Sequence, residues 1–142
     1  MKSIGICVGA STLSSVTLIK EQGGKVRTEA VFIEPHHGNP RSALLRYVQT
    51  LPRGNGLRIA VTGRKFRQLV NLPSLSEPEA VEKALFHLNG KNGAVDAVVS
   101  AGGETFMVYL LGENGRISTV RTGNKCASGT GEFYVQQLRR IG

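Results

Sequence analysis

The sequence has few of the features that mark membrane or secreted proteins. No apolar run approaches the roughly 18 residues that a membrane-spanning helix needs. The two cysteines, Cys7 and Cys126, are too few for a disulfide framework. The short apolar stretch near Met1 leads into strand-like alternation. No cleavage site of small residues follows a long enough apolar region, so the stretch predicts a strand rather than a signal peptide. These features favour a cytoplasmic protein.

Aromatic residues are also scarce, at 6% of the 142 residues, and Lys and Arg outnumber Asp and Glu by 18 to 10. A formal net charge of +8 suits an anionic ligand, a nucleic acid or an acidic partner. The basic residues are scattered, with small groups at residues 64–67 and 139–140. Proteins that read nucleic acids normally carry a basic stripe or a known motif, so this distribution argues against nucleic-acid binding.

Apolar periodicity and turn residues predict the order β-β-β-α-β-α-β over the first hundred residues. The expected strands span residues 3–8, 14–19, 26–34, 57–61 and 94–100, and the expected helices span residues 40–51 and 76–89. A meander followed by alternating helices and strands indicates an α/β fold, a mixed sheet flanked by helices.

A second hairpin is expected at residues 105–111 and 116–121, followed by a helix at residues 132–141. We therefore predict a first subdomain at residues 1–100 and the beginning of a second at residues 101–142. The apolar face of the last helix has no later segment to cover it, so we expect the chain to be truncated at the start of the second subdomain.

Two glycine-containing turns between strands are candidate phosphate loops. The first comprises Gly9, Ala10, Ser11 and Thr12, and the second comprises Gly102, Gly103 and Glu104. Small residues between strands leave backbone N–H groups unpaired, and such a concavity of donors suits a phosphate. Glu104 could in addition orient water or a hydrated Mg²⁺. Each turn by itself is also compatible with a plain hairpin connection.

A third motif surrounds Cys126, directly before the expected last helix. Lys125 and the positive end of the helix dipole would favour the thiolate, which is the form that binds soft metals. One cysteine cannot complete an iron–sulfur site, whereas a two-fold axis and a further cysteine downstream could. The alternative is a structural cysteine beside a glycine-rich loop.

Together these motifs resemble the ATP-dependent activators of 2-hydroxyacyl-CoA dehydratases and benzoyl-CoA reductases. That family belongs to the actin, sugar-kinase and Hsp70 superfamily. Its hallmarks are G-I-D-x-G-S-T, T-G-Y-G-R, a Ser-Glu pair at a helix start, G-G-Q-D and N-D-K-C-A-A-G-T-G. They correspond in order to residues 5–12, 62–64, 76–77, 102–105 and 124–131.

The resemblance implies a ribonuclease H-like (actin-like ATPase) fold that binds ATP and Mg²⁺ through the two loops. It also implies a homodimer that shares a 4Fe–4S cluster. Cys126 of each subunit would be a ligand, together with a second cysteine beyond residue 142. The partner would be a 2-hydroxyacyl-CoA dehydratase or a benzoyl-CoA reductase that receives an electron.

The sequence departs from the family pattern at positions that matter for ATP hydrolysis. Cys7 stands where the family has an Asp, Thr105 stands where it has an acidic residue, and the usual Lys after the first loop is absent. A thiol cannot replace a carboxylate as a ligand of Mg²⁺. ATPase activity is therefore left open.

Two alternative functions share this fold. One is a degenerate dimerisation or docking module without catalysis. The other is a small-molecule kinase, which would need a catalytic Asp; Asp96, the only Asp, is expected to be structural. We expect the adjacent His36 and His37 to be solvated in a loop, and His87 to lie on the surface.

Overall fold

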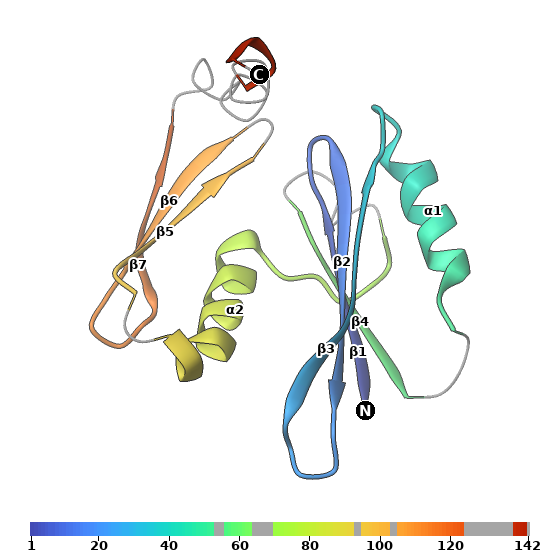
Figure 1. Ribbon diagram of the computed structural model, residues 1–142, viewed down its shortest axis with the longest axis horizontal. Helices are drawn as coiled ribbons and strands as arrows, with labels where there is room; N and C mark the ends of the chain where they lie inside the picture. The colour runs from blue at the N-terminus through green and yellow to red at the C-terminus, as the bar shows by residue number, and fades with distance from the viewer. Residues whose placement is uncertain (53–55, 64–69, 93–94, 103–104, 124–137, 142) are drawn as a thin grey trace. The chain divides into compact units, whose positions relative to one another are not determined.

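The computed structural model describes residues 1–52, 56–63, 70–92, 95–102, 105–123 and 138–141, with only the backbone for residues 89–92. The chain divides into two compact units, Met1–Glu77 and Pro78–Gly142. Each unit is built around its own sheet (Figure 1). No helix in the described part of the chain is long and apolar enough to cross a membrane.

The first unit contains a four-stranded mixed sheet in the order β3-β2-β1-β4. Its elements are β1 (Lys2–Val8), β2 (Thr12–Lys20), β3 (Val26–Pro35), α1 (Pro40–Thr50) and β4 (Leu57–Thr62). β2 runs antiparallel to both β1 and β3, whereas β4 runs parallel to β1. The predicted meander and the following crossover through a helix are thereby confirmed.

The core of the first unit lies between this sheet and α1, which runs along one face of the sheet (Figure 1). Strand alternation turns Ile4, Ile6 and Val8 toward that face, and all three are buried. Leu44 and Tyr47 are the buried side chains of α1 that pack on them. Burial of these apolar side chains is the main favourable term for folding of this unit.

Helix α1 begins as its sequence predicts. The Asn39 side chain caps it by accepting a hydrogen bond from the Ser42 N–H at 3.2 Å, and Pro40 occupies the first turn. Tyr47 stacks on Phe32 of β3, with 4.7 Å between ring centroids. The Tyr47 hydroxyl also forms a short hydrogen bond with the buried Ser15 hydroxyl, which fixes the helix on the sheet.

The second unit holds most of α2 (Glu77–Asn92) and an antiparallel sheet in the order β5-β6-β7. Its strands are β5 (Ala97–Ala101), β6 (Phe106–Leu111) and β7 (Ile117–Thr122). The Glu82 carboxylate accepts a hydrogen bond from the Ile117 N–H at 3.0 Å and so ties α2 to β7. Met107 and Tyr109 are buried, as expected for the core of a hairpin.

The predicted boundary near residue 101 differs from the structure. β5 pairs with β6 along its whole length, so it belongs with the second hairpin and not with the first sheet. The first compact unit ends at Glu77. The apolar run of β5 predicts a strand but does not say which sheet it joins, and the structure pairs it with the strand that follows it directly in the chain. Of the expected last helix, only residues 138–141 are described, and they are helical.

Candidate functional site

The first predicted phosphate loop is a tight turn between β1 and β2. The Gly9 N–H donates to the Thr12 carbonyl oxygen at 2.9 Å and closes the turn. Ala10 and Ser11 are exposed at its tip. Within the described residues, no backbone carbonyl accepts a hydrogen bond from the amide of either residue. The loop therefore presents two adjacent N–H donors to solvent, which suits an anion.

The second predicted loop repeats this local geometry in the other unit. The Gly102 N–H donates to the Thr105 carbonyl oxygen at 2.8 Å. A Cβ on Gly102 would lie 3.2 Å from that oxygen, and a Cβ on Gly9 would lie 3.2 Å from the Thr12 oxygen. Each turn thus connects two consecutive strands through the sequence Gly-x-x-Thr. Gly103 and Glu104 lie outside the described residues, so their predicted contacts with phosphate and Mg²⁺ stay predictions.

His36 differs from its prediction as a solvated loop residue. It is 5% exposed, because its ring lies against the first loop and its Nε2 is 3.2 Å from the Gly9 carbonyl oxygen. Its backbone N–H donates to the Ser11 carbonyl oxygen at 3.0 Å. The sequence offers no signal for this contact, since 27 residues separate His36 from Gly9. His37 and His87 are exposed, as expected.

Gly63, directly after β4, packs against Val8 at the end of β1, just before the first loop. Its φ is +124°, and a Cβ there would lie 2.3 Å from the Val8 carbonyl oxygen, so only glycine fits. The adjacent Thr62 pairs with Cys7 across the parallel strands. The Thr62 hydroxyl oxygen is buried, and no described residue forms a hydrogen bond with it. Thr62 and Gly63 of the motif at residues 62–64 thus lie against the end of β1, which leads into the loop, and Arg64 lies outside the described residues.

Cys7, which takes the place of the family's Asp, is exposed at the end of β1. Desolvation by its surroundings, and secondarily the negative charge of Glu77, raise the pKa of the Cys7 thiol. Glu77 comes close because Val61 of β4 exchanges backbone hydrogen bonds with Pro73 and Leu75, at 2.8 and 2.9 Å. The charge of a carboxylate therefore acts on Cys7 even though β1 itself carries none.

The predicted cluster ligand Cys126 lies outside the described residues. Cys7 is the only cysteine that the structure describes, and no group of three or more His, Cys, Asp or Glu residues there could hold a metal ion. The Asp96 carbonyl oxygen accepts a hydrogen bond from the Leu111 N–H at 2.9 Å, which places this residue at the end of the hairpin.

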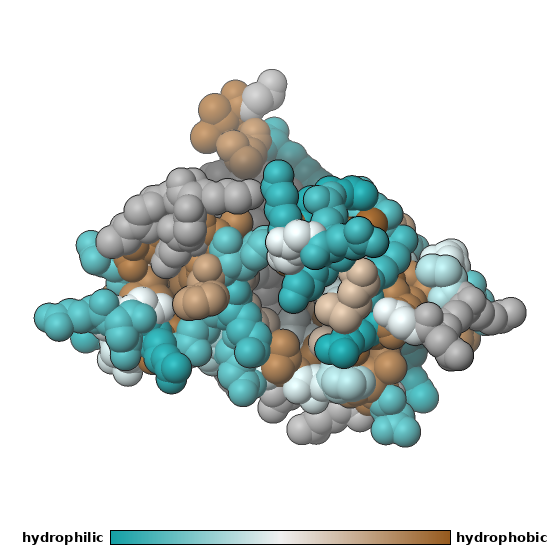
Figure 2. All heavy atoms as spheres, turned by 90° about the horizontal axis from the view of Figure 1, so that it is seen from below, coloured by the Kyte–Doolittle hydropathy of each residue, from teal (hydrophilic) through white to brown (hydrophobic). Residues whose placement is uncertain are grey.

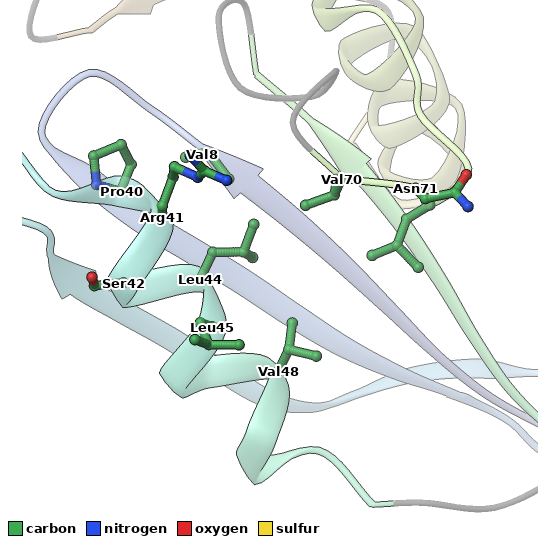
Figure 3. A pocket seen from close by; sticks show the side chains of 10 residues that line it. Val8, Pro40, Arg41, Ser42, Leu44, Leu45, Val48, Val70 and Asn71 are labelled. Atoms are coloured by element: carbon green, nitrogen blue, oxygen red, sulfur yellow. The ribbon is translucent and has the colours of Figure 1, made fainter.

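A cavity of about 460 Å³ lies between α1 and residues 70–72 (Figure 3). Leu44, Leu45 and Val48 line it from α1, and Val70 lines it from the other side. Among the described residues of this lining, Arg41 is the one with a charged side chain. An apolar cavity of this kind does not suit a phosphate, and we assign it no part in the site.

The outer surface carries mixed polarity. On the face shown in Figure 2, hydrophilic residues predominate and apolar residues lie among them. Three ion pairs join described residues: Lys2–Glu29, Arg27–Glu21 and Arg46–Glu34. The excess of Lys and Arg over Asp and Glu, 18 to 10, gives a positive long-range potential, which favours anionic ligands.

No protein-family model matches the sequence, and no curated protein matches it. Solved structures do match. The activator of 2-hydroxyisocaproyl-CoA dehydratase from Clostridium difficile, with bound ADPNP, is 21% identical with a TM-score of 0.75. That match covers 99% of this chain and 52% of the activator.

Two further structures support the same fold. Component A of (R)-2-hydroxyglutaryl-CoA dehydratase from Acidaminococcus fermentans is 22% identical, with a TM-score of 0.66 over 94% of this chain and 51% of that one. The Ppx/GppA family member from Aquifex aeolicus is 9% identical, with a TM-score of 0.55 over 88% of this chain and 51% of that one. The chain therefore spans about half the length of these proteins, and it has their actin-like, ribonuclease H-type fold.

Proposed function

We propose that this chain is part of an ATP-dependent activator that transfers an electron to a CoA-thioester dehydratase or reductase. The observation that carries the proposal is the matched pair of turns, Gly9 to Thr12 and Gly102 to Thr105, in this fold. In each turn a glycine amide closes the loop on a threonine carbonyl. The tip of the first turn offers amide donors for the phosphates of ATP.

The residues at the first loop fit ATP better than they fit Mg²⁺. Cys7 offers a soft sulfur, and Mg²⁺ prefers hard oxygen ligands. Glu77 is the carboxylate whose charge acts on Cys7, two residues before this loop, and the Ser11 and Thr12 side chains add hydroxyl oxygens. We propose that Glu77 takes over part of the work of the missing Asp by orienting water of a hydrated Mg²⁺. Hydrolysis would then be slower than with the family's Asp.

The second half of the proposal concerns the 4Fe–4S cluster and the dehydratase or reductase that receives its electron. Cys126 would contribute one thiolate from each subunit of a homodimer to a 4Fe–4S cluster, with a second cysteine beyond residue 142. Such a cluster, when bound, supplies a one-electron carrier. The resemblance of residues 124–131 to the activator motif supports this assignment. A cytoplasmic location belongs to the same proposal.

A nucleotide-binding experiment on the full-length protein tests the first half. We expect Gly9→Val to weaken ADPNP binding at least about tenfold, because a branched side chain would crowd the Thr12 carbonyl oxygen and deform the turn. Gly23→Val is the matched control, since no atom lies within 4 Å of a Cβ at that position. Calorimetric titration measures both. Equal affinity of the Gly9 variant and the parent protein would contradict phosphate binding at this loop.

A second candidate function is a docking or dimerisation module that no longer turns over ATP. Cys7 and Thr105 favour it, because both replace acidic residues of the family pattern. The two candidates differ in one measurement. An activator hydrolyses Mg-ATP and loses that activity with Glu77→Gln, whereas a docking module shows no hydrolysis in either form.

A further inference from the structure

We propose that His36 is a positioning residue for the first phosphate loop, and that it holds the loop with its carbonyl groups turned inward and its amides outward. This inference rests on the proposed nucleotide binding. His36 lies between β3 and α1 and belongs to none of the motifs that carry the family resemblance.

Two separate hydrogen bonds join His36 to the loop. The ring Nε2 lies 3.2 Å from the Gly9 carbonyl oxygen, and the backbone N–H donates to the Ser11 carbonyl oxygen at 3.0 Å. A carbonyl oxygen only accepts hydrogen bonds, so Nε2 carries a proton in this arrangement. The side chain and the main chain of one residue thus occupy carbonyl groups on both sides of Ala10.

Occupation of these carbonyl groups matters for an anion. A carbonyl oxygen that faced a phosphate would repel it, whereas an N–H group attracts it. The Gly9, Ser11 and Thr12 carbonyl oxygens are all engaged within the protein, and the Ala10 and Ser11 amides have no backbone acceptor among the described residues, so these two amides are left for a ligand. His36 therefore determines the polarity of the turn as well as its position.

The position of His36 is itself fixed. Its carbonyl oxygen accepts a hydrogen bond from the Asn39 N–H at 2.8 Å. His37 and Gly38 follow with φ of 47° and 80°, so the chain reverses immediately after His36 and enters α1. The ring is held between this reversal and the loop at 5% exposure. Such burial limits its rotation and makes it a stiff support for Gly9.

The second loop lacks a comparable side chain among the described residues. There the residue after β7 is Gly123, whose N–H donates to the Phe106 carbonyl oxygen at 3.0 Å. This main-chain contact is made with the first residue of β6 and not with the turn, and glycine supplies no ring. We infer that the His36 side chain serves the first loop specifically.

Three substitutions in the full-length protein test this role. Gln places an amide nitrogen near the position of Nε2, whereas Asn places it near Nδ1, too short to reach Gly9. We expect His36→Asn and His36→Ala to weaken ADPNP binding about tenfold, and His36→Gln to stay within about threefold of the parent. Adenosine, which lacks phosphate, should bind all variants alike. His37→Ala, an exposed neighbour, is the control.

Amide hydrogen exchange at Gly9 and at residue 36 provides a readout that does not depend on the nucleotide. Both amides should exchange faster in the Asn and Ala variants and remain protected in the Gln variant. If ADPNP affinity is equal in all three variants, or if Gln behaves like Ala, His36 does not position the loop. If the parent protein binds no ADPNP, the proposed function fails. If amide hydrogen exchange at Gly9 and at residue 36 is unchanged in the His36→Asn variant, the proposed role of the His36 contact fails as well.

Discussion

Gly63 shows how a single atom can decide the geometry next to the first loop. Its φ of +124° is one that L-residues rarely adopt, and a Cβ would meet the Val8 carbonyl oxygen at 2.3 Å. Backbone atoms cannot yield as a flexible side chain can. The close approach of β4 to the end of β1 therefore requires glycine.

We expect Gly63→Ala to lower the free energy of unfolding by about 2–4 kcal/mol, because it combines a backbone clash with an unfavourable φ. Thermal unfolding followed by circular dichroism measures this as a midpoint lower by about 5–15 °C. Gly23→Ala should leave the midpoint nearly unchanged, since its Cβ would meet open space. A Gly63 variant as stable as this control would show that β4 can move away from Val8.

Cys7 should react slowly with alkylating reagents at neutral pH. Its pKa is raised by desolvation and by the Glu77 carboxylate, so the thiolate fraction is small and grows only at alkaline pH. Glu77→Gln removes a negative charge and lowers the pKa of Cys7, which should speed the reaction with iodoacetamide at a given pH. Peptide mass spectrometry separates Cys7 from Cys126. An unchanged rate in the variant would show that the Glu77 charge does not act on Cys7.

At the scale of elements, α1 is held on the sheet by both apolar and polar contacts. Tyr47 combines stacking on Phe32 with a hydrogen bond to Ser15, and both members of that bond are buried. Buried hydroxyl groups cost free energy when they lose their partner. This pair therefore selects one position of α1 along β2.

A double-mutant cycle tests this contact. We expect Tyr47→Phe and Ser15→Ala each to lower the free energy of unfolding by about 1–2 kcal/mol, since each leaves the other hydroxyl buried without its partner. The double variant should lose less than the sum, with a coupling of about 1 kcal/mol. Denaturant unfolding measures all three. Ser14→Ala, next to Ser15 in β2, should show no coupling with Tyr47→Phe.

For the whole molecule, the described units supply two similar turns but no complete site. Each turn follows the first strand of its sheet, and each is closed by a glycine amide on a threonine carbonyl oxygen. This chain spans about half the length of each of the three solved structures that it resembles.

The iron content of the full-length protein, purified without oxygen, tests the proposed cluster. We expect about four irons per dimer for each cluster site, with acid-labile sulfide in equal amount, and a loss of that share in Cys126→Ala. Cys7→Ala is the matched control and should retain its iron. Equal iron in the Cys126 variant and the parent protein would exclude Cys126 as a ligand and favour the docking module.

The sequence by itself determined the local features. Strand alternation, the turns at Gly9 and Gly102, and the Asn39–Pro40 helix start all depend on residues close together in the chain, and the structure confirms them. These signals arise from short-range sterics and from the periodicity of apolar residues, which a single sequence displays.

Only the tertiary structure decided how distant segments meet. It buries His36 against Gly9 and brings Glu77 near Cys7. Neither contact has a local signature in the sequence, because each joins residues that are far apart along the chain. The expectation of a solvated His36 was wrong for that reason: a loop residue becomes buried when another loop folds against it.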